Sequence, residues 1–146
     1  MVRFPQALHD ALIAHCQRHY PKEACGLLAG DRGLVSEVYP MTNVEDSPIG
    51  YAMDPREQLR TEQLMRQRGQ RLLGIYHSHT ASAAYPSSVD VRLAISPELS
   101  YVLVSLADRT RPDVKSYRIE AEQVTPEPLV VEPGASGTAP IASAAR

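Results

Sequence analysis

The amino-terminal part of the chain carries apolar residues at the spacing of a helix. Leu8, Leu12 and Cys16 recur every four residues and would form one apolar stripe. This pattern predicts an amphipathic helix over residues 5–19, which ends before Pro21 because proline does not continue a helix.

Two further helices are predicted from their start signals. Asp54, Pro55 and Glu57 place a capping residue, a first-turn proline and a capping-box glutamate in order, and Gly69 supplies the stop. A shorter helix is expected over residues 87–95.

The remaining apolar segments are short and fit strands. Residues 31–33 are typical of a turn between two such runs, so a β-hairpin is predicted there. Residues 71–79 are apolar on both alternating faces, as in an inner strand that is covered on both sides. The predicted strands are 23–30, 34–39, 71–79, 101–107, 114–119 and about 124–131. Helices interleaved with these strands predict an α/β fold with a mixed central sheet flanked by helices.

The length of 146 residues predicts one domain. We place this domain at residues 1–131. Eleven of the last fifteen residues are Ala, Gly, Ser or Pro, a composition that buries too little surface to offset its ordering entropy. Residues 132–146 are therefore predicted to form a flexible tail.

Charge and hydropathy narrow the choice of partners and compartment. Fifteen basic and 17 acidic residues give a net charge of -2 with no basic block, so nucleic acid is not an expected partner. The apolar run at 101–107 is far shorter than the ~20 residues of a membrane span, and no signal peptide is recognisable. We expect a cytoplasmic protein whose two cysteines, Cys16 and Cys25, are buried free thiols.

Two histidines end the predicted inner strand. His77 and His79 are two residues apart, so both imidazoles project from one face of the strand. Ser87 and Asp90 follow at the start of the short helix. Two imidazoles and one carboxylate can hold a zinc ion with a fourth position open for water. Each part also has a simpler interpretation: strand-end histidines are often structural, and Ser-x-x-Asp is a common helix cap.

Taken jointly, these residues resemble the zinc signature of the JAMM metalloproteases, also called the MPN+ or Mov34-type family. His77, Ser78, His79, Ser87 and Asp90 match that signature without a gap, and residues 21–30 are similar to a bacterial version of its amino-terminal segment. The resemblance implies a cytidine-deaminase-like JAMM/MPN fold. It also implies one Zn²⁺ per chain held by His77, His79 and Asp90.

The resemblance further implies the catalytic roles. In the family a glutamate near the amino terminus is the general acid and base, which corresponds here to Glu23. Ser87 would stabilise the oxyanion of the tetrahedral intermediate, because no group remains to activate it as a nucleophile once both histidines hold metal.

The longer matching stretches are most similar to a bacterial branch of the family that acts on small ubiquitin-like sulfur-carrier proteins. This implies hydrolysis of the bond between the carboxyl-terminal glycine of such a carrier, with a Gly-Gly end, and cysteine, a late step of cysteine biosynthesis. A different ubiquitin-like carrier or modifier, and a non-catalytic MPN binding module, are the alternatives. A homodimer is an open option. Deamination is disfavoured because zinc deaminases need a Cys-x-x-Cys segment, which the chain lacks.

Other candidate residues have weaker patterns. His15, Cys16 and His19 could bind metal, but packing and solvation on a helix face explain them better. Tyr76 and Tyr85 flank the metal-site residues and could either line a substrate channel or pack.

Overall fold

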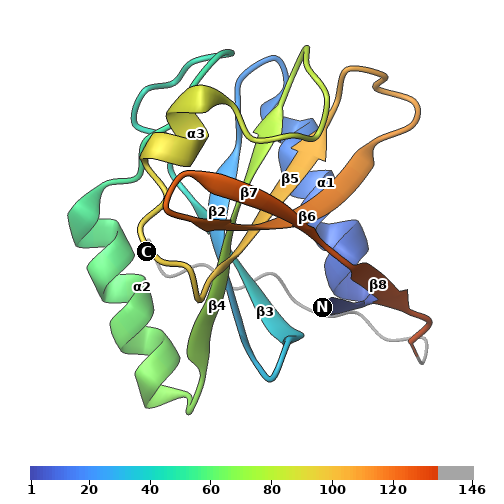
Figure 1. Cartoon of the computed structure of the whole chain (residues 1–146). Helices are drawn as coiled ribbons and strands as arrows, with labels where there is room; N and C mark the ends of the chain where they lie inside the picture. Colours follow the sequence, from blue (N-terminus) through green and yellow to red (C-terminus); the bar gives the residue numbers. More distant parts are fainter. Residues whose placement is uncertain (135–146) are drawn as a thin grey trace.

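A computed structural model describes residues 1–134 as a mixed α/β fold (Figure 1). An eight-stranded sheet runs through this part of the chain in the order β7-β6-β5-β4-β2-β3-β1-β8. The strands are β1 (Val2–Pro5), β2 (Cys25–Asp31), β3 (Leu34–Met41), β4 (Arg71–His79), β5 (Ser100–Ser105), β6 (Asp113–Glu120), β7 (Gln123–Glu127) and β8 (Leu129–Glu132). The helices are α1 (Gln6–His19), α2 (Pro55–Gln67) and α3 (Ser88–Arg92).

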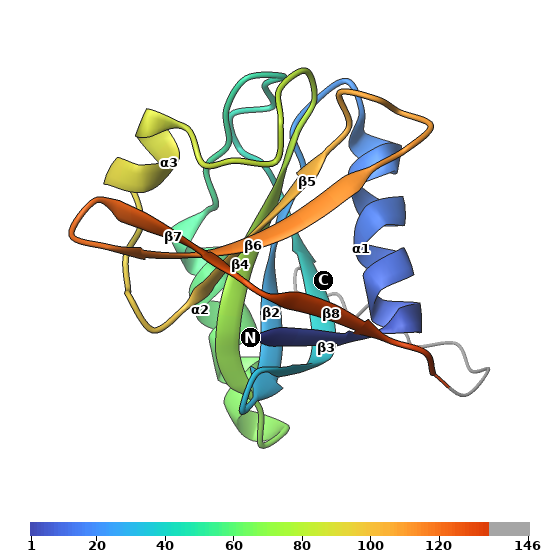
Figure 2. The ribbon, with the colours of Figure 1, turned by 45° about the vertical axis from the view of Figure 1, so that its right-hand side comes forward.

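The helices lie on both faces of the sheet, α1 on one and α2 with α3 on the other (Figure 2). On the α1 side, Leu8 and Leu12 belong to the same hydrophobic core as Leu28 of β2. On the opposite side, Met65 of α2 belongs to the same core as Leu27. Successive residues of β2 therefore serve opposite cores, which is why this inner strand is apolar on both faces.

The connection from β4 to β5 determines where a site can form. These two strands are parallel, with Gly74 opposite Ser100 and His79 opposite Ser105, and α3 lies in the segment that joins them. Their carboxyl ends therefore lie side by side at one end of the sheet, next to the start of α3. Open α/β sheets commonly bind ligands beyond the carboxyl ends of their strands.

The predicted helices and the hairpin are confirmed, with ends that shift by a few residues. The strands differ from the prediction at two places. The segment Val2–Pro5, for which no strand was predicted, is a strand because it pairs in parallel with β3 and β8. Residues 124–131 form two strands, β7 and β8, which pair with different neighbours across the sheet.

Three other expectations concern the cysteines, membrane-spanning helices and the domain boundary. Cys16 and Cys25 are free and buried, as predicted. No helix within residues 1–134 is long and apolar enough to cross a membrane. The boundary predicted after Val131 stays a prediction: Glu132 still belongs to β8, and residues 135–146 of the predicted tail lie outside the described residues.

Candidate active site

His77 and His79 lie at the carboxyl end of β4, on the face of the sheet that α2 and α3 cover. Alternation along β4 puts them on the same side as Ile75, which packs in the core under α2. The two imidazoles are almost fully buried, at 5% and 6% exposure. Both predicted histidines therefore face α3.

Asp90 approaches the histidines from the first turn of α3. Ser87 is the N-cap: its hydroxyl accepts a hydrogen bond from the Asp90 backbone N–H at 3.1 Å, and Asp90 Oδ2 accepts one from the Ser87 N–H at 2.8 Å. This reciprocal capping box fixes the direction of the Asp90 carboxylate. The helix-cap interpretation is thus correct, and the same cap turns Asp90 toward the histidines.

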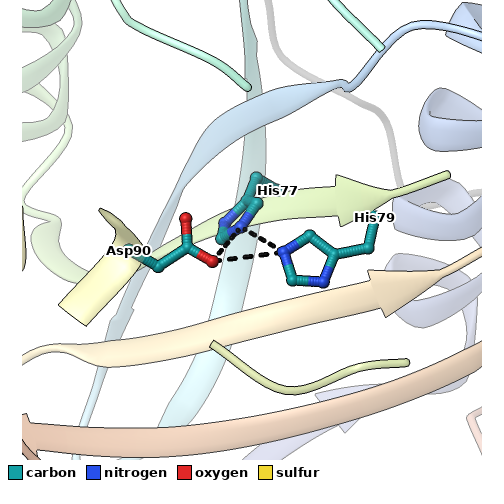
Figure 3. A group of neighbouring side chains, drawn as sticks. All are labelled: His77, His79 and Asp90. Atoms are coloured by element: carbon teal, nitrogen blue, oxygen red, sulfur yellow. Dashed lines mark hydrogen bonds and ion pairs between the residues drawn. The ribbon is translucent and has the colours of Figure 1, made fainter. Parts of the chain in front are cut away.

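Three ligand atoms converge at this point (Figure 3). Asp90 Oδ2 lies 3.2 Å from His77 Nε2 and 3.1 Å from His79 Nε2, and the two Nε2 atoms are 3.2 Å apart. Ligands of a tetrahedral zinc at ~2.0–2.1 Å are separated from one another by about 3.3 Å. The spacing and the donor types therefore fit a zinc ion, and His77, His79 and Asp90 could hold it.

Hydrogen bonds around the cluster support the same conclusion. His79 Nδ1 lies 2.9 Å from the Ala83 carbonyl oxygen, which can only accept, so Nδ1 carries a proton and Nε2 is the ring atom that faces the cluster and could bind an ion. The ring of Tyr51 stacks on His77 with 4.5 Å between centroids. Both imidazoles are thus held in orientation before any ion binds.

Burial and hydrogen bonds shift the pKa values of all three residues in the cluster. Burial lowers the pKa of His77, which favours the neutral ring that a metal requires. Burial would raise the pKa of Asp90, but hydrogen bonds from the two histidines hold it well below its usual range. The pKa of His79 is raised, because its bonds to Asp90 and Ala83 outweigh burial.

Glu23 precedes β2, which pairs with β4 on the side opposite to β5, and it reaches the same site from there. β2 runs antiparallel to β4 with Cys25 opposite His77, so extending this register by two residues brings Glu23 opposite His79. Glu23 is 6% exposed, and burial raises its pKa to about 7, with the nearby Asp90 and Glu45 charges acting in the same direction and His79 against them. A carboxyl group of this kind can exchange protons near neutral pH.

One open cavity of about 640 Å³ joins these groups. Glu23, His79, Ser87 and Asp90 all line it, and the buried His77 contacts Asp90 at 3.2 Å. The structure therefore brings together all five residues that the sequence singled out.

The far wall of the cavity was not predicted from the sequence. It is formed by the loop of residues 42–52, between β3 and α2, which we call the 42–52 loop. Ile49 and Tyr51 of this loop contribute to the lining. Nothing in the local sequence of the loop marks it as part of a site.

The structure also places the histidine and tyrosines for which the sequence pattern was weaker. His15 is buried and its Nδ1 lies 2.7 Å from the Tyr76 hydroxyl, so these two side chains belong to the core under α1. Tyr76 therefore packs and does not line the cavity. Tyr85 is 55% exposed and packs edge-on against Tyr117.

Comparison with known proteins places this geometry in a family. The model of a family described as prokaryotic homologs of the JAB domain matches residues 5–120, more than half of the chain. The chain belongs to this family. The CysO-cysteine peptidase of Mycobacterium tuberculosis is 47% identical to it over 126 residues, which make up 85% of this chain and 86% of that protein. A probable TtuB-protein conjugate cleaving protease of Thermus thermophilus is 41% identical over 91 residues, 62% of this chain and 61% of that protein.

Solved structures agree with this assignment. The solution structure of protein DSY2949 from Desulfitobacterium hafniense has a TM-score of 0.84 and 39% identity, and covers 93% of this chain and 96% of its own. A JAB1/MPN domain protein from Archaeoglobus fulgidus shares the fold at a TM-score of 0.57 and 19% identity, over 90% of this chain and 98% of its own. The predicted JAMM/MPN fold is confirmed, and this JAB-domain chain is a peptidase, a hydrolase.

Proposed function

We propose that this chain is a zinc metallopeptidase that hydrolyses the bond between the carboxyl-terminal glycine of a ubiquitin-like sulfur-carrier protein and cysteine. The observation that carries the proposal is the convergence of His77, His79 and Asp90 beside the cavity that Glu23 and Ser87 line. A zinc ion held by the three ligands would supply Lewis acidity, which makes water a stronger acid and polarises a carbonyl group.

Glu23 is the general acid and base of the proposed reaction. With its pKa near 7, the carboxylate can take a proton from the attacking water and later return it to the departing amine at cell pH. Its burial supports this role, because a carboxylate fully in water would be too weak a base. The position opposite His79 supports it further, since the proton must move next to the metal site.

Ser87 stabilises the developing oxyanion. Its oxygen already accepts the Asp90 N–H at 3.1 Å, so the hydroxyl hydrogen is free to donate into the cavity. Ser87 is exposed at the cavity wall and can meet a substrate carbonyl there. A fixed donor aimed at developing negative charge is a common source of transition-state stabilisation.

The choice of substrate rests on the relatives. The name of the Mycobacterium tuberculosis relative gives a CysO-cysteine bond as its substrate, and we extend this to a carrier of the same kind, ending in Gly-Gly, for this chain. Release of cysteine would make the reaction a late step of cysteine biosynthesis. A cytoplasmic location agrees with the two free thiols, Cys16 and Cys25, because disulfides are rare in that compartment.

The second candidate is cleavage of a different conjugate. The Thermus thermophilus relative is named for TtuB-protein conjugates, so a ubiquitin-like modifier attached to a protein amine is the alternative substrate. Both candidates use the same residues and differ in the leaving group.

The test of the chemistry is Glu23→Gln, which keeps the shape of the side chain but cannot accept a proton. Hydrolysis should fall by about 10²–10⁴-fold while zinc content stays at one per chain. Glu45→Gln is the matched control, because it removes another carboxylate from the same cavity; its activity should stay within a few-fold of wild type. A fully active Glu23→Gln variant would show that the general base is wrong.

The test of the substrate uses mass spectrometry. The purified protein is incubated, with and without a chelator, with carrier proteins extended at the carboxyl terminus by cysteine or joined to a lysine amine. Loss of cysteine alone would support the first candidate. Loss of the lysine adduct alone would replace it by the second.

A further inference from the structure

Glu23 lies outside the regular hydrogen bonding of the sheet. It comes two residues before β2 begins, so strand pairing does not bind its backbone. The 42–52 loop binds it instead. The Glu23 N–H donates to the Ser47 carbonyl at 2.9 Å, and the Glu23 carbonyl accepts from Asn43 Nδ2 at 3.0 Å. Both backbone polar groups of this residue are thus held by one loop.

Asn43 is the centre of that loop. Its Nδ2 donates to the carbonyls of Glu23 and Gly50, each at 3.0 Å. Its Oδ1 accepts from the N–H groups of Glu45 at 3.1 Å and Ala52 at 3.2 Å. These four bonds use both donors and both acceptor positions of the amide. The orientation is unambiguous, because a flipped amide would turn its oxygen toward two carbonyl oxygens.

The loop is in turn fixed to the rest of the fold at two places. At its start, the buried carboxylate of Glu57 on α2 accepts from the Thr42 N–H at 2.8 Å and from the Thr42 hydroxyl at 3.0 Å. At its middle, the Thr80 hydroxyl donates to the Pro48 carbonyl at 2.9 Å, just beyond the end of β4. The loop therefore joins α2 to the end of the strand that carries the histidines. In Figure 1 it is the teal segment at the same end of the sheet as α3.

We propose that Asn43 is a positioning residue that holds the backbone of Glu23 so that its carboxylate reaches the His77, His79 and Asp90 cluster. This inference rests on the proposed function, in which Glu23 moves the proton. General-base catalysis needs the base within hydrogen-bond reach of its proton, and a misplacement of about 1 Å can cost about 100-fold in rate. Asn43 does not touch the cavity chemistry itself; it acts through Glu23.

The first variants are Asn43→Asp and Asn43→Ala. The aspartate has nearly the same shape but replaces both donors with an oxygen, and the alanine removes the whole amide without adding charge. For both we expect kcat to fall by about 10- to 100-fold, KM to change by less than about three-fold, and zinc to remain at one per chain. Zinc content and thermal melting report whether each variant is folded.

Thr42→Val is the matched control. It removes the hydroxyl bond to Glu57 but keeps the backbone bond, so it loosens the same loop without touching Glu23. Its kcat should equal that of wild type. An equal loss of kcat in Thr42→Val would mean that general loosening of the loop explains the effect, and it would overturn the proposal.

A double-mutant cycle separates this proposal from the proposed function. If Asn43 acts through Glu23, then adding Asn43→Ala to Glu23→Gln should lower the residual rate by less than about two-fold. Full additivity of the two losses, or wild-type kcat in both Asn43 variants, would overturn the role of Asn43 and leave Glu23 as the base. Full activity of Glu23→Gln would instead overturn the proposed function, and the role of Asn43 with it.

Discussion

A buried hydrogen bond joins helix α1 to strand β4, and its removal tests how much that contact stabilises the fold. The Tyr76 hydroxyl and His15 Nδ1 are 2.7 Å apart, and the two residues are 0% and 3% exposed. Gly26 makes room for the tyrosine: a Cβ at this position would lie 2.3 Å from the Tyr76 ring. The ring therefore lies directly over the backbone of β2 and cannot move toward it.

The perturbation is Tyr76→Phe, which removes one oxygen and leaves the ring in place. His15 Nδ1 then loses its partner in a site from which water is excluded. An orphaned buried polar group costs about 1–3 kcal/mol, and for a chain of this length each kcal/mol lowers Tm by about 4 °C. We expect a loss of about 4–12 °C in Tm, with a matching fall in the urea midpoint.

The assay is urea and thermal unfolding at pH 7.5, followed by circular dichroism. Tyr85→Phe is the control, because this tyrosine is 55% exposed, and it should stay within about 0.5 kcal/mol of wild type. The double variant His15→Leu/Tyr76→Phe should regain part of the loss, since replacing both partners by apolar groups leaves neither unsatisfied. A Tyr76→Phe protein as stable as the control would refute the reasoning.

Two further predictions concern protons and metal. Burial, with the His19 and Arg18 charges, lowers the pKa of His15 from 6.5 to about 3. The unfolded chain therefore binds a proton below about pH 6.5 that the folded chain does not, and stability should fall as pH decreases from there toward about 3, by up to about 1.4 kcal/mol per unit. In metal-free protein, urea unfolding at pH 7.5 and pH 5 should show a smaller loss for His15→Leu than for wild type; equal losses would contradict the assignment. Zinc at a thousand-fold excess over its Kd should stabilise the wild-type fold by about 4 kcal/mol and so raise its Tm. The Tm of Asp90→Ala should not change when zinc is added. An equal rise in Asp90→Ala would place the ion elsewhere.

The local parts of the site were predictable because they depend on local geometry. The two-residue spacing of His77 and His79 puts both rings on one face of any strand, and Ser87 with Asp90 forms a capping box in any helix that begins there. The helices were predictable for the same reason, from apolar spacing and start signals. β1 could not be predicted, because four residues become a strand only by pairing with β3 and β8, which are distant in sequence.

The role of Tyr76 could not be predicted from the sequence. Its position next to His77 allowed it either to line the cavity or to pack in the core, and the choice depended on which face of β4 meets α1. Asn43 gave no signal at all. Its bonds are to backbone groups up to 20 residues away, and every residue type offers the same carbonyl and N–H there.

By itself, the sequence identified the candidate site residues, Glu23, His77, His79, Ser87 and Asp90, and their spacing matches the JAMM signature. Only the tertiary structure decided how Glu23 reaches the histidines, through the pairing of β2 with β4 and the bonds from the 42–52 loop. The physical reason is that side-chain identity and strand or helix period are encoded locally, whereas the backbone hydrogen bonds that position a catalytic group form between distant segments and carry no residue-specific signature.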